Sequence, residues 1–124
     1  MRWAWRWAPV LAQMGAIFYA SSMTAVPDLP GGLTDKTGHL IGYALLSALA
    51  IRGFAGAAWS GVTAGAAVRA VLLSAAYGAS DEFHQKFVAN RTSDVHDWFA
   101  DVLGALLGVT IALVAARVIR RRRA

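Results

Sequence analysis

The chain contains no cysteine, which excludes disulfide bridges, thiolate zinc sites and cysteine nucleophiles. Carboxylates are also scarce, with seven Asp and Glu among 124 residues against twelve Lys and Arg. The resulting net charge of +5 could suggest nucleic-acid binding. Most of the basic residues, however, stand at the ends of apolar runs, as is typical of membrane anchors. We therefore expect no nucleic-acid partner.

Apolar residues are abundant instead: 57% of the chain is hydrophobic, and the mean hydropathy is +0.48. These values exceed those of an ordinary soluble domain. A membrane-spanning helix needs about 20 mostly apolar residues, and the sequence predicts four, at residues 3–23, 36–54, 66–83 and 94–119. The predicted fold is a single all-α domain over residues 1–124, an integral membrane bundle of four transmembrane helices. The expected location is the cell (inner) membrane, with the lipid bilayer as a partner.

The first apolar run has an alternative reading as a signal peptide. Arg2 and Arg6 precede it, and residues 19–22 resemble a small-residue cleavage site. We favour an uncleaved helix, because the run is long enough to span and cleavage would leave an odd number of helices. Pro27 and Pro30 then break the chain before the second helix.

The cations predict the orientation of the four helices. Nine of the twelve would lie on one side of the membrane and three on the other. The nine are Arg2, Arg6, Arg52, Arg69, Arg117 and the four arginines at 120–123; the three are Lys36, Lys86 and Arg91. Short loops rich in Lys and Arg stay cytoplasmic, so both termini are expected inside the cell.

Polar residues form stripes at helical spacing near the opposite side. Asp35, His39 and Tyr43 are four residues apart and share one face of the second predicted helix. The third and fourth helices carry similar stripes, made of Tyr77, Asp81 and Gln85 with Glu82 beside them, and of Asp94, Asp97 and Asp101. Ionisable groups at such depths are costly and need a structural or functional reason. We expect the three stripes to meet in a polar pocket that opens to the outside.

Glycines continue two of these stripes inward. Gly104 and Gly108 follow Asp101, and Gly38 and Gly42 lie in the second helix. Small residues at this spacing let membrane helices approach closely. These four glycines are the predicted helix-packing positions.

Three motifs follow one another along the chain: Asp35-Lys36-x-x-His39-x-x-x-Tyr43, Asp81-Glu82-x-x-Gln85-x-Phe87, and Arg91-x-x-Asp94-x-x-Asp97-x-x-x-Asp101-x-x-Gly104-x-x-x-Gly108. With them, the chain resembles the VanZ-like membrane proteins over roughly residues 33–110. The family is named for a member associated with resistance to teicoplanin, a lipoglycopeptide, and its general activity is not established. The resemblance implies a membrane protein of the cell envelope. Many members have Pro-Gly before the arginine, where this chain has Ala89-Asn90.

The leading functional prediction is a pocket that binds a lipid or cell-wall precursor head group. Arg91 and Lys36 would meet an anion, and the other polar residues would shape the site. The predicted ligand-binding residues are Asp35, Lys36, His39, Tyr43, Asp81, Glu82, Gln85, Arg91, Asp94, Asp97 and Asp101. A link to teicoplanin-type glycopeptide resistance remains open from the resemblance.

Two other classes stay open. In the first, the protein is an intramembrane enzyme that modifies an envelope lipid, with Glu82 or Asp97 as general base and His39 as its partner. In the second, it is a structural or assembly subunit whose glycine faces bind partner helices. The sequence leaves both the catalytic residues and the oligomeric state undecided.

Three local expectations complete the prediction. Glu82 and Arg91 could form an ion pair that closes the outer loop. Asp101 is expected to pair with a cation, for which Lys36 and Arg91 are available, to be protonated, or to line a wet cavity. Thr92 or Ser93 is expected to cap the fourth helix. No metal or cofactor is expected, since the histidines come from different elements without an H-E-x-x-H spacing.

Overall fold

The computed structural model describes residues 1–24, 31 and 35–124. In these residues the chain forms four α-helices and no strand. The helices are α1 (Arg2–Ser21), α2 (Asp35–Phe54), α3 (Ala64–Gln85) and α4 (Val95–Arg123), with a short 3-10 turn, η2 (Trp59–Gly61), between α2 and α3. The prediction of an all-α chain with four helices is confirmed. The predicted breaks at Pro27 and Pro30 lie outside the described residues.

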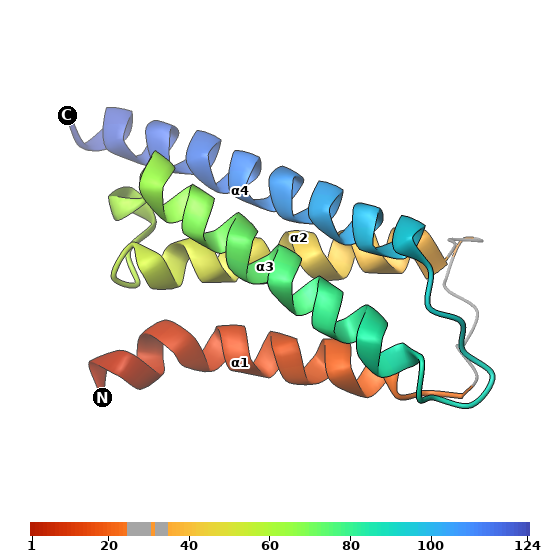
Figure 1. Cartoon of the computed structure of the whole chain (residues 1–124). Helices are drawn as coiled ribbons and strands as arrows, with labels where there is room; N and C mark the ends of the chain where they lie inside the picture. The colour runs from red at the N-terminus through yellow and green to blue at the C-terminus, as the bar shows by residue number, and fades with distance from the viewer. Residues whose placement is uncertain (25–30, 32–34) are drawn as a thin grey trace.

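Successive helices run antiparallel, so that both chain termini lie at the same end of the bundle (Figure 1). We call this end the terminal end. The opposite end, where α1 and α3 finish and α2 and α4 begin, is called the polar end. The central helix is α2, which packs against each of the other three α-helices and most extensively against α4.

Arginine side chains join α1 to α2 at the terminal end. Arg6 Nε donates to the carbonyl oxygen of Gly53 at 3.1 Å, near the C-terminus of α2. Arg52 Nη1 donates to the carbonyl oxygen of Trp5 at 3.3 Å. That carbonyl lies four residues before Pro9, which has no N–H to donate within the helix. Arg52 therefore supplies a donor where the proline removes one.

Glycine allows α4 to approach the backbone of α2 closely. A Cβ at Gly104 would overlap the carbonyl oxygen of Leu40, and one at Gly108 would overlap the carbonyl oxygen of Ala44. Ser47 Oγ adds a hydrogen bond of 2.8 Å to a backbone carbonyl of α4. Because both glycines are buried against backbone atoms, no larger residue fits at this distance between the helices.

Gly38 and Gly42 of α2, which were also predicted as helix-packing positions, have other neighbours. The carbonyl oxygen of Gly42 accepts a hydrogen bond from Gln13 Nε2 of α1 at 3.0 Å. A Cβ at Gly42 would lie 3.9 Å from Ile17 Cγ1, an ordinary contact. Gly42 therefore faces α1, and Gly38 lines a cavity described below. In the α2–α4 contact, the closely packed glycines come from α4.

Of the helices in the described residues, α4 is the one that is both long and apolar enough to cross a membrane. The other three have sufficient length, but α2 carries Asp35, Lys36 and Arg52, and α3 is rich in alanine and glycine. The structure thus supports four helices and one candidate membrane span. Four crossings are not confirmed.

Candidate functional site

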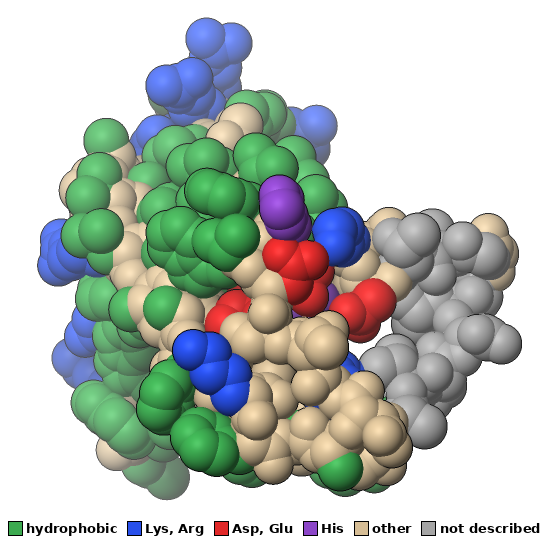
Figure 2. All heavy atoms as spheres, turned by 45° about the vertical axis from the view of Figure 1, so that its right-hand side comes forward, with side chains coloured by type: hydrophobic (Ala, Val, Ile, Leu, Met, Phe, Trp, Pro, Cys, Tyr) green, Lys and Arg blue, Asp and Glu red, His purple; other side chains and the backbone are tan. Residues whose placement is uncertain are grey.

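Acidic, basic and histidine side chains gather at the polar end of the bundle. Figure 2 shows Asp and Glu side chains beside His and Lys or Arg side chains there, with apolar side chains on the adjoining surface. The charged residues of this end belong to the first turns of α2 and α4, to the last turns of α3, and to the loop between α3 and α4. The antiparallel arrangement brings together residues that lie more than 60 positions apart in the sequence.

The deepest polar contact joins α2 to α4. His39 Nδ1 lies 2.7 Å from Asp101 Oδ1, so the two side chains share a short hydrogen bond across the helix interface. Asp101 is fully buried, and the side chain of His39 is nine-tenths buried. On its other nitrogen, His39 Nε2 lies 3.7 Å from Asp35 Oδ2 at the surface. His39 therefore connects an exposed carboxylate to a buried one.

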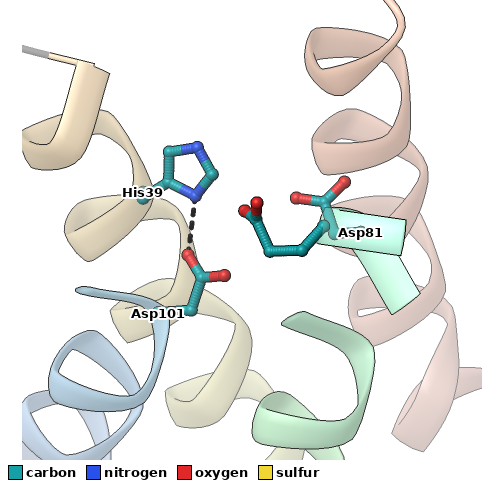
Figure 3. A group of neighbouring side chains, drawn as sticks. His39, Asp81 and Asp101 are labelled. Atoms are coloured by element: carbon teal, nitrogen blue, oxygen red, sulfur yellow. Dashed lines mark hydrogen bonds and ion pairs between the residues drawn. The ribbon is translucent and has the colours of Figure 1, made fainter. Parts of the chain in front are cut away.

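A second contact joins α2 to α3. Tyr43 OH donates to Asp81 Oδ2 at 3.3 Å, and both residues are buried. The rings of His39 and Tyr43 lie parallel with their centroids 6.4 Å apart, as expected for residues one turn apart on a helix. In Figure 3, His39, Asp81 and Asp101 point toward one another from three helices.

Glu82 and Asp94 join α3 to the start of α4. Glu82 Oε2 accepts a hydrogen bond from the backbone N–H of Asp94 at 3.2 Å. Asp94 is itself the N-cap of α4, because its side chain accepts from the backbone N–H of His96 at 2.9 Å. The predicted caps, Thr92 and Ser93, are therefore wrong by one or two positions.

The same cap changes the acidity of Asp94. Its carboxylate accepts hydrogen bonds from the backbone N–H of His96 and then from the His96 side chain, and these lower the pKa of Asp94 from its ordinary value. Hydrogen bonds to a carboxylate favour its charged form. A negative charge at this position also suits the N-terminal end of the helix dipole.

Lys36 is held at the rim of the site by two carboxylates of α4. Its Nζ donates to Asp97 Oδ1 at 3.1 Å and lies 3.7 Å from Asp94 Oδ2. Asp97 is buried while the Lys36 side chain stays exposed, so the ammonium covers the carboxylate on its solvent side. The lysine is thus occupied by neighbours within the chain.

Two predicted pairings are corrected by these contacts. The partner of Asp101 is His39, whereas the sequence analysis named Lys36 or Arg91. Glu82 bonds to the Asp94 backbone, and Arg91 Nη1 donates to the carbonyl oxygen of Met23 at 3.4 Å. In the described part of the chain Glu82 and Arg91 do not form an ion pair, because each is directed toward backbone of a different segment.

Several buried polar atoms of this site have no hydrogen-bond partner among the described residues. Each belongs to a side chain that is at least nine-tenths buried. At the polar end they are Asp81 Oδ1, Glu82 Oε1, Asp101 Oδ2 and Gln85 Nε2. Buried polar groups are nearly always paired, so such a group calls for a specific explanation.

A cavity of about 240 Å³ opens beside this cluster. Its polar wall includes Asp35, His39, Tyr43, Asp81 and Arg91, with Gly38 and Gly42 between them. Its other wall belongs to α1 and the residues just after it: Ile17, Ala20, Ser21 and Met23. The other predicted ligand-binding residues do not line it; these are Lys36, Glu82, Gln85, Asp94, Asp97 and Asp101.

The contribution of α1 to this site was not predicted from the sequence. Ile17 and Ala20 carry no reactive group, and nothing in their spacing distinguishes them from lipid-facing residues. The loop before α4 contains a residue in the left-handed region of the backbone. Asn90 has a positive φ of 63°, a conformation that glycine and asparagine tolerate best.

The fold and the site together define a class: a small all-helical bundle with a buried histidine–carboxylate cluster at one end and a candidate membrane span. The VanZ/LLP1 family model matches residues 7–117. The chain belongs to the VanZ/LLP1 family, and the resemblance drawn from its three motifs is confirmed. Searches of curated proteins and of solved structures found no match.

Proposed function

We propose that this protein is a multi-pass membrane protein of the cell envelope that binds a lipid or cell-wall precursor head group at its polar end. Membership of the VanZ/LLP1 family supports membrane association. The outward surface supports it too, since large apolar side chains of α4 are exposed in a row. They are Phe99, Leu103, Leu106, Leu107, Ile111, Val114 and Val118. An apolar surface of this extent on a soluble monomer would be unusual.

In the proposed orientation all four helices cross the membrane and both termini are cytoplasmic. The termini share one end of the bundle, and the C-terminal arginines are at that end (Figure 1). Arginine-rich short segments stay on the cytoplasmic side. The polar end then faces the outside, where envelope lipids and cell-wall precursors expose their head groups.

The cavity is the observation that carries the binding proposal. Its volume of about 240 Å³ is below the usual range for a drug-sized ligand, roughly 300 to 1,000 Å³, and suits a head group. One wall is apolar and the other polar, which matches a molecule with both characters. An amphiphile could place its chain along Ile17 and Ala20 and its head against His39 and Asp81.

The charges of the lining indicate the chemistry of this head group. Arg91 contributes a guanidinium group to the cavity lining, and this group can bind a phosphate through two N–H donors in one plane. Lys36, which the sequence analysis paired with it, is bound to Asp97 instead. Asp35 and Asp81 are acceptors suited to hydroxyl or amine groups. A head group with a phosphate and a hydroxyl or amine therefore fits best.

The test uses mass spectrometry of the lipids that copurify with the full-length chain in mild detergent. Ala20→Phe should fill the cavity from an exposed position of α1 and reduce the copurifying lipid several-fold. Arg91→Lys should also reduce it, because a point charge cannot reproduce the guanidinium fork.

Ala16→Phe is the matched control, since Ala16 is exposed on the same helix and does not line the cavity. It should leave the lipid profile unchanged. Equal lipid retention in the wild type, Ala20→Phe and Ala16→Phe would contradict the proposal.

An enzymatic alternative is favoured by one specific observation: Glu82 Oε1 is buried and has no partner among the described residues. A carboxylate oxygen left free in this way could act as a general base toward a bound lipid. Asp97, the other predicted base, is occupied by Lys36. Lipid profiles of cells producing the wild type or Glu82→Gln at matched level distinguish the two: a lipid that changes with Glu82 indicates catalysis, and identical profiles indicate binding alone.

The family resemblance also suggests a phenotype. Binding of a cell-wall precursor could alter the response to teicoplanin-type glycopeptides. We expect cells that produce the wild-type chain to tolerate more teicoplanin than cells that produce Ala20→Phe, as measured by the minimal inhibitory concentration. Equal concentrations for both would remove the resistance link while leaving lipid binding intact.

A further inference from the structure

We propose that His39, Asp81, Glu82 and Asp101 form a binding site for one divalent transition-metal ion. The four residues come from three helices, α2, α3 and α4, and Figure 3 labels His39, Asp81 and Asp101. One ligand atom from each lies within 4.8 Å of all the others. This inference does not rest on the proposed function, because it is argued from the unpaired oxygens of the buried cluster, although His39 and Asp81 of that cluster also line the cavity.

The orphaned oxygens are an independent observation that points to an ion. Asp81 Oδ1, Glu82 Oε1 and Asp101 Oδ2 lack hydrogen-bond partners among the described residues. Their side chains are 4%, 7% and 0% exposed, so bulk solvent does not satisfy them. Each of the three residues uses its second oxygen for a bond to Tyr43, to the Asp94 backbone or to His39. These bonds hold the carboxylates in place and leave Glu82 Oε1 and Asp101 Oδ2 free, while the Ser21 hydroxyl lies beside Asp81.

Electrostatics makes the same cluster costly without a cation. Three buried carboxylates face a single imidazole, and like charges in a buried site repel strongly. Lys36 is bound to Asp97, and Arg91 reaches the Met23 carbonyl. A divalent ion would neutralise two of the three carboxylate charges at once. Coordination to the ion would also give the free carboxylate oxygens the partner that they lack.

The donor set indicates which ion. Carboxylate oxygens suit Mg²⁺, Ca²⁺ and Mn²⁺, whereas imidazole nitrogen suits Zn²⁺, iron and other first-row metals. One imidazole with three carboxylates therefore favours Mn²⁺, Fe²⁺ or Zn²⁺ over Mg²⁺ and Ca²⁺. His39 and Asp81 line the cavity, which provides an entry path to the buried cluster.

From the sequence no metal is expected, because the histidines lie in different elements and no local ligand motif is present. In the folded chain His39 is the one histidine of the cluster, and its fellow ligands are carboxylates from α3 and α4. A site assembled across helices leaves no fixed spacing in the sequence.

The experiment titrates the purified full-length chain, stripped with EDTA in mild detergent, with Mn²⁺. The electron paramagnetic resonance signal of free Mn²⁺ measures the unbound ion. We expect one saturable site per chain, displaced by Zn²⁺ but not by excess Mg²⁺. Glu82→Gln and Asp101→Asn should each weaken binding by at least the roughly 10- to 100-fold that losing an outer-shell partner costs.

Two control variants locate the ion. Asp94→Asn removes a carboxylate outside the cluster, and asparagine is as good an N-cap as aspartate, so Mn²⁺ affinity should be unchanged. Asp97→Asn tests a neighbouring group, Asp35, His39 and Asp97, which is also close enough to hold an ion. Loss of binding in Asp97→Asn with retention in Glu82→Gln would place the ion there and overturn the proposal.

The wild type alone provides a test that does not depend on the folding of any variant. Pulsed electron paramagnetic resonance of bound Mn²⁺ should show coupling to an imidazole nitrogen, as a site that includes His39 requires. Absence of that coupling, or absence of saturable Mn²⁺ and Zn²⁺ binding, would overturn the site.

Discussion

At the residue scale, the buried pair of His39 and Asp101 connects the central helix to α4. The two side chains are 62 positions apart in sequence and 2.7 Å apart in the fold. A buried carboxylate is tolerated when a partner stabilises its charge. The hydrogen bond to His39 therefore stabilises one oxygen of Asp101, which is fully buried inside the bundle.

Removal of one member of this pair should be more harmful than removal of both. His39→Leu leaves Asp101 buried without its partner, at an expected cost of about 3–5 kcal/mol in unfolding free energy. His39→Leu combined with Asp101→Leu should recover most of the loss. Chemical unfolding in detergent with a chelator present measures both. A double variant no more stable than the single one would contradict a special role for the pair.

The cap formed by Asp94 should make the stability of the start of α4 depend on pH. Its pKa is lower in the folded chain than in the unfolded chain, because the folded carboxylate accepts bonds from His96. The stabilisation is therefore present above the unfolded pKa, about 3.9, and is lost as the pH falls through the folded pKa.

A cap variant makes this measurable. Asp94→Ala should lower helix stability at neutral pH, and the difference from the wild type should shrink under acid conditions. Circular dichroism during thermal unfolding, from about pH 6 down to about pH 3 around the unfolded pKa, follows the effect. Asp94→Asn is the control, since it keeps the cap without a titrating group. A difference that stays constant with pH would exclude the carboxylate as its origin.

At the scale of the elements, the contact between α2 and α4 depends on the absence of side chains. Gly104 and Gly108 lie directly against backbone carbonyls of α2. This close approach brings Asp97 in the first turn of α4 within reach of Lys36, and Asp101 in the second turn within reach of His39. The packing of two glycines thus positions the charged residues three to eleven positions before them.

Substitution of these glycines should separate the helices. Gly104→Ala places a Cβ on the Leu40 carbonyl oxygen and should cost at least about 1–3 kcal/mol, as overpacking does. Gly15→Ala is the matched control, because no heavy atom lies within 4 Å of its Cβ and the residue is exposed on α1. It should be neutral or stabilising by about 0.5–1 kcal/mol. Similar losses of stability in Gly104→Ala and Gly15→Ala would show that replacing a helical glycine is itself the cause, and would contradict a role in the approach of α4 to α2.

At the scale of the whole molecule, the arginines are concentrated at the end of the bundle that holds both chain termini. The nine arginines that the sequence analysis assigns to the inner side belong to residues near the terminal end, and several bond to helix ends there. Arg6, Arg52 and Arg120 each donate to backbone carbonyls of other elements. The same arginines can thus anchor the bundle at a membrane surface and close its loops.

The proposed orientation predicts a labelling pattern in intact cells. The chain has no cysteine, so single substitutions report their own position. Ser93→Cys, in the loop before α4, should react with a membrane-impermeant thiol reagent. Ala124→Cys, at the C-terminus, should react after the cells are opened and not before. The reverse pattern would place the polar end in the cytoplasm and overturn the head-group proposal.

The sequence by itself determined the four helices and the stripes of polar residues on them. Helical periodicity is local, so the spacing of Asp35, His39 and Tyr43 predicts a shared face without knowledge of the neighbours. The C-terminal arginines and the glycines at 104 and 108 carry comparable local information. The family resemblance follows from the same motifs, and the family model confirms it.

Only the tertiary structure decided which residues meet. The pairing of Asp101 with His39, the cap at Asp94 and the share of α1 in the cavity depend on the rotation and approach of whole helices. Candidate partners with the right charge, such as Lys36, Arg91 and His39, are equivalent in sequence. Gly104 and Gly108 bring α4 against α2, and the closest approach of the two backbones sets which side chains can touch. In the fold it is His39 that contacts Asp101.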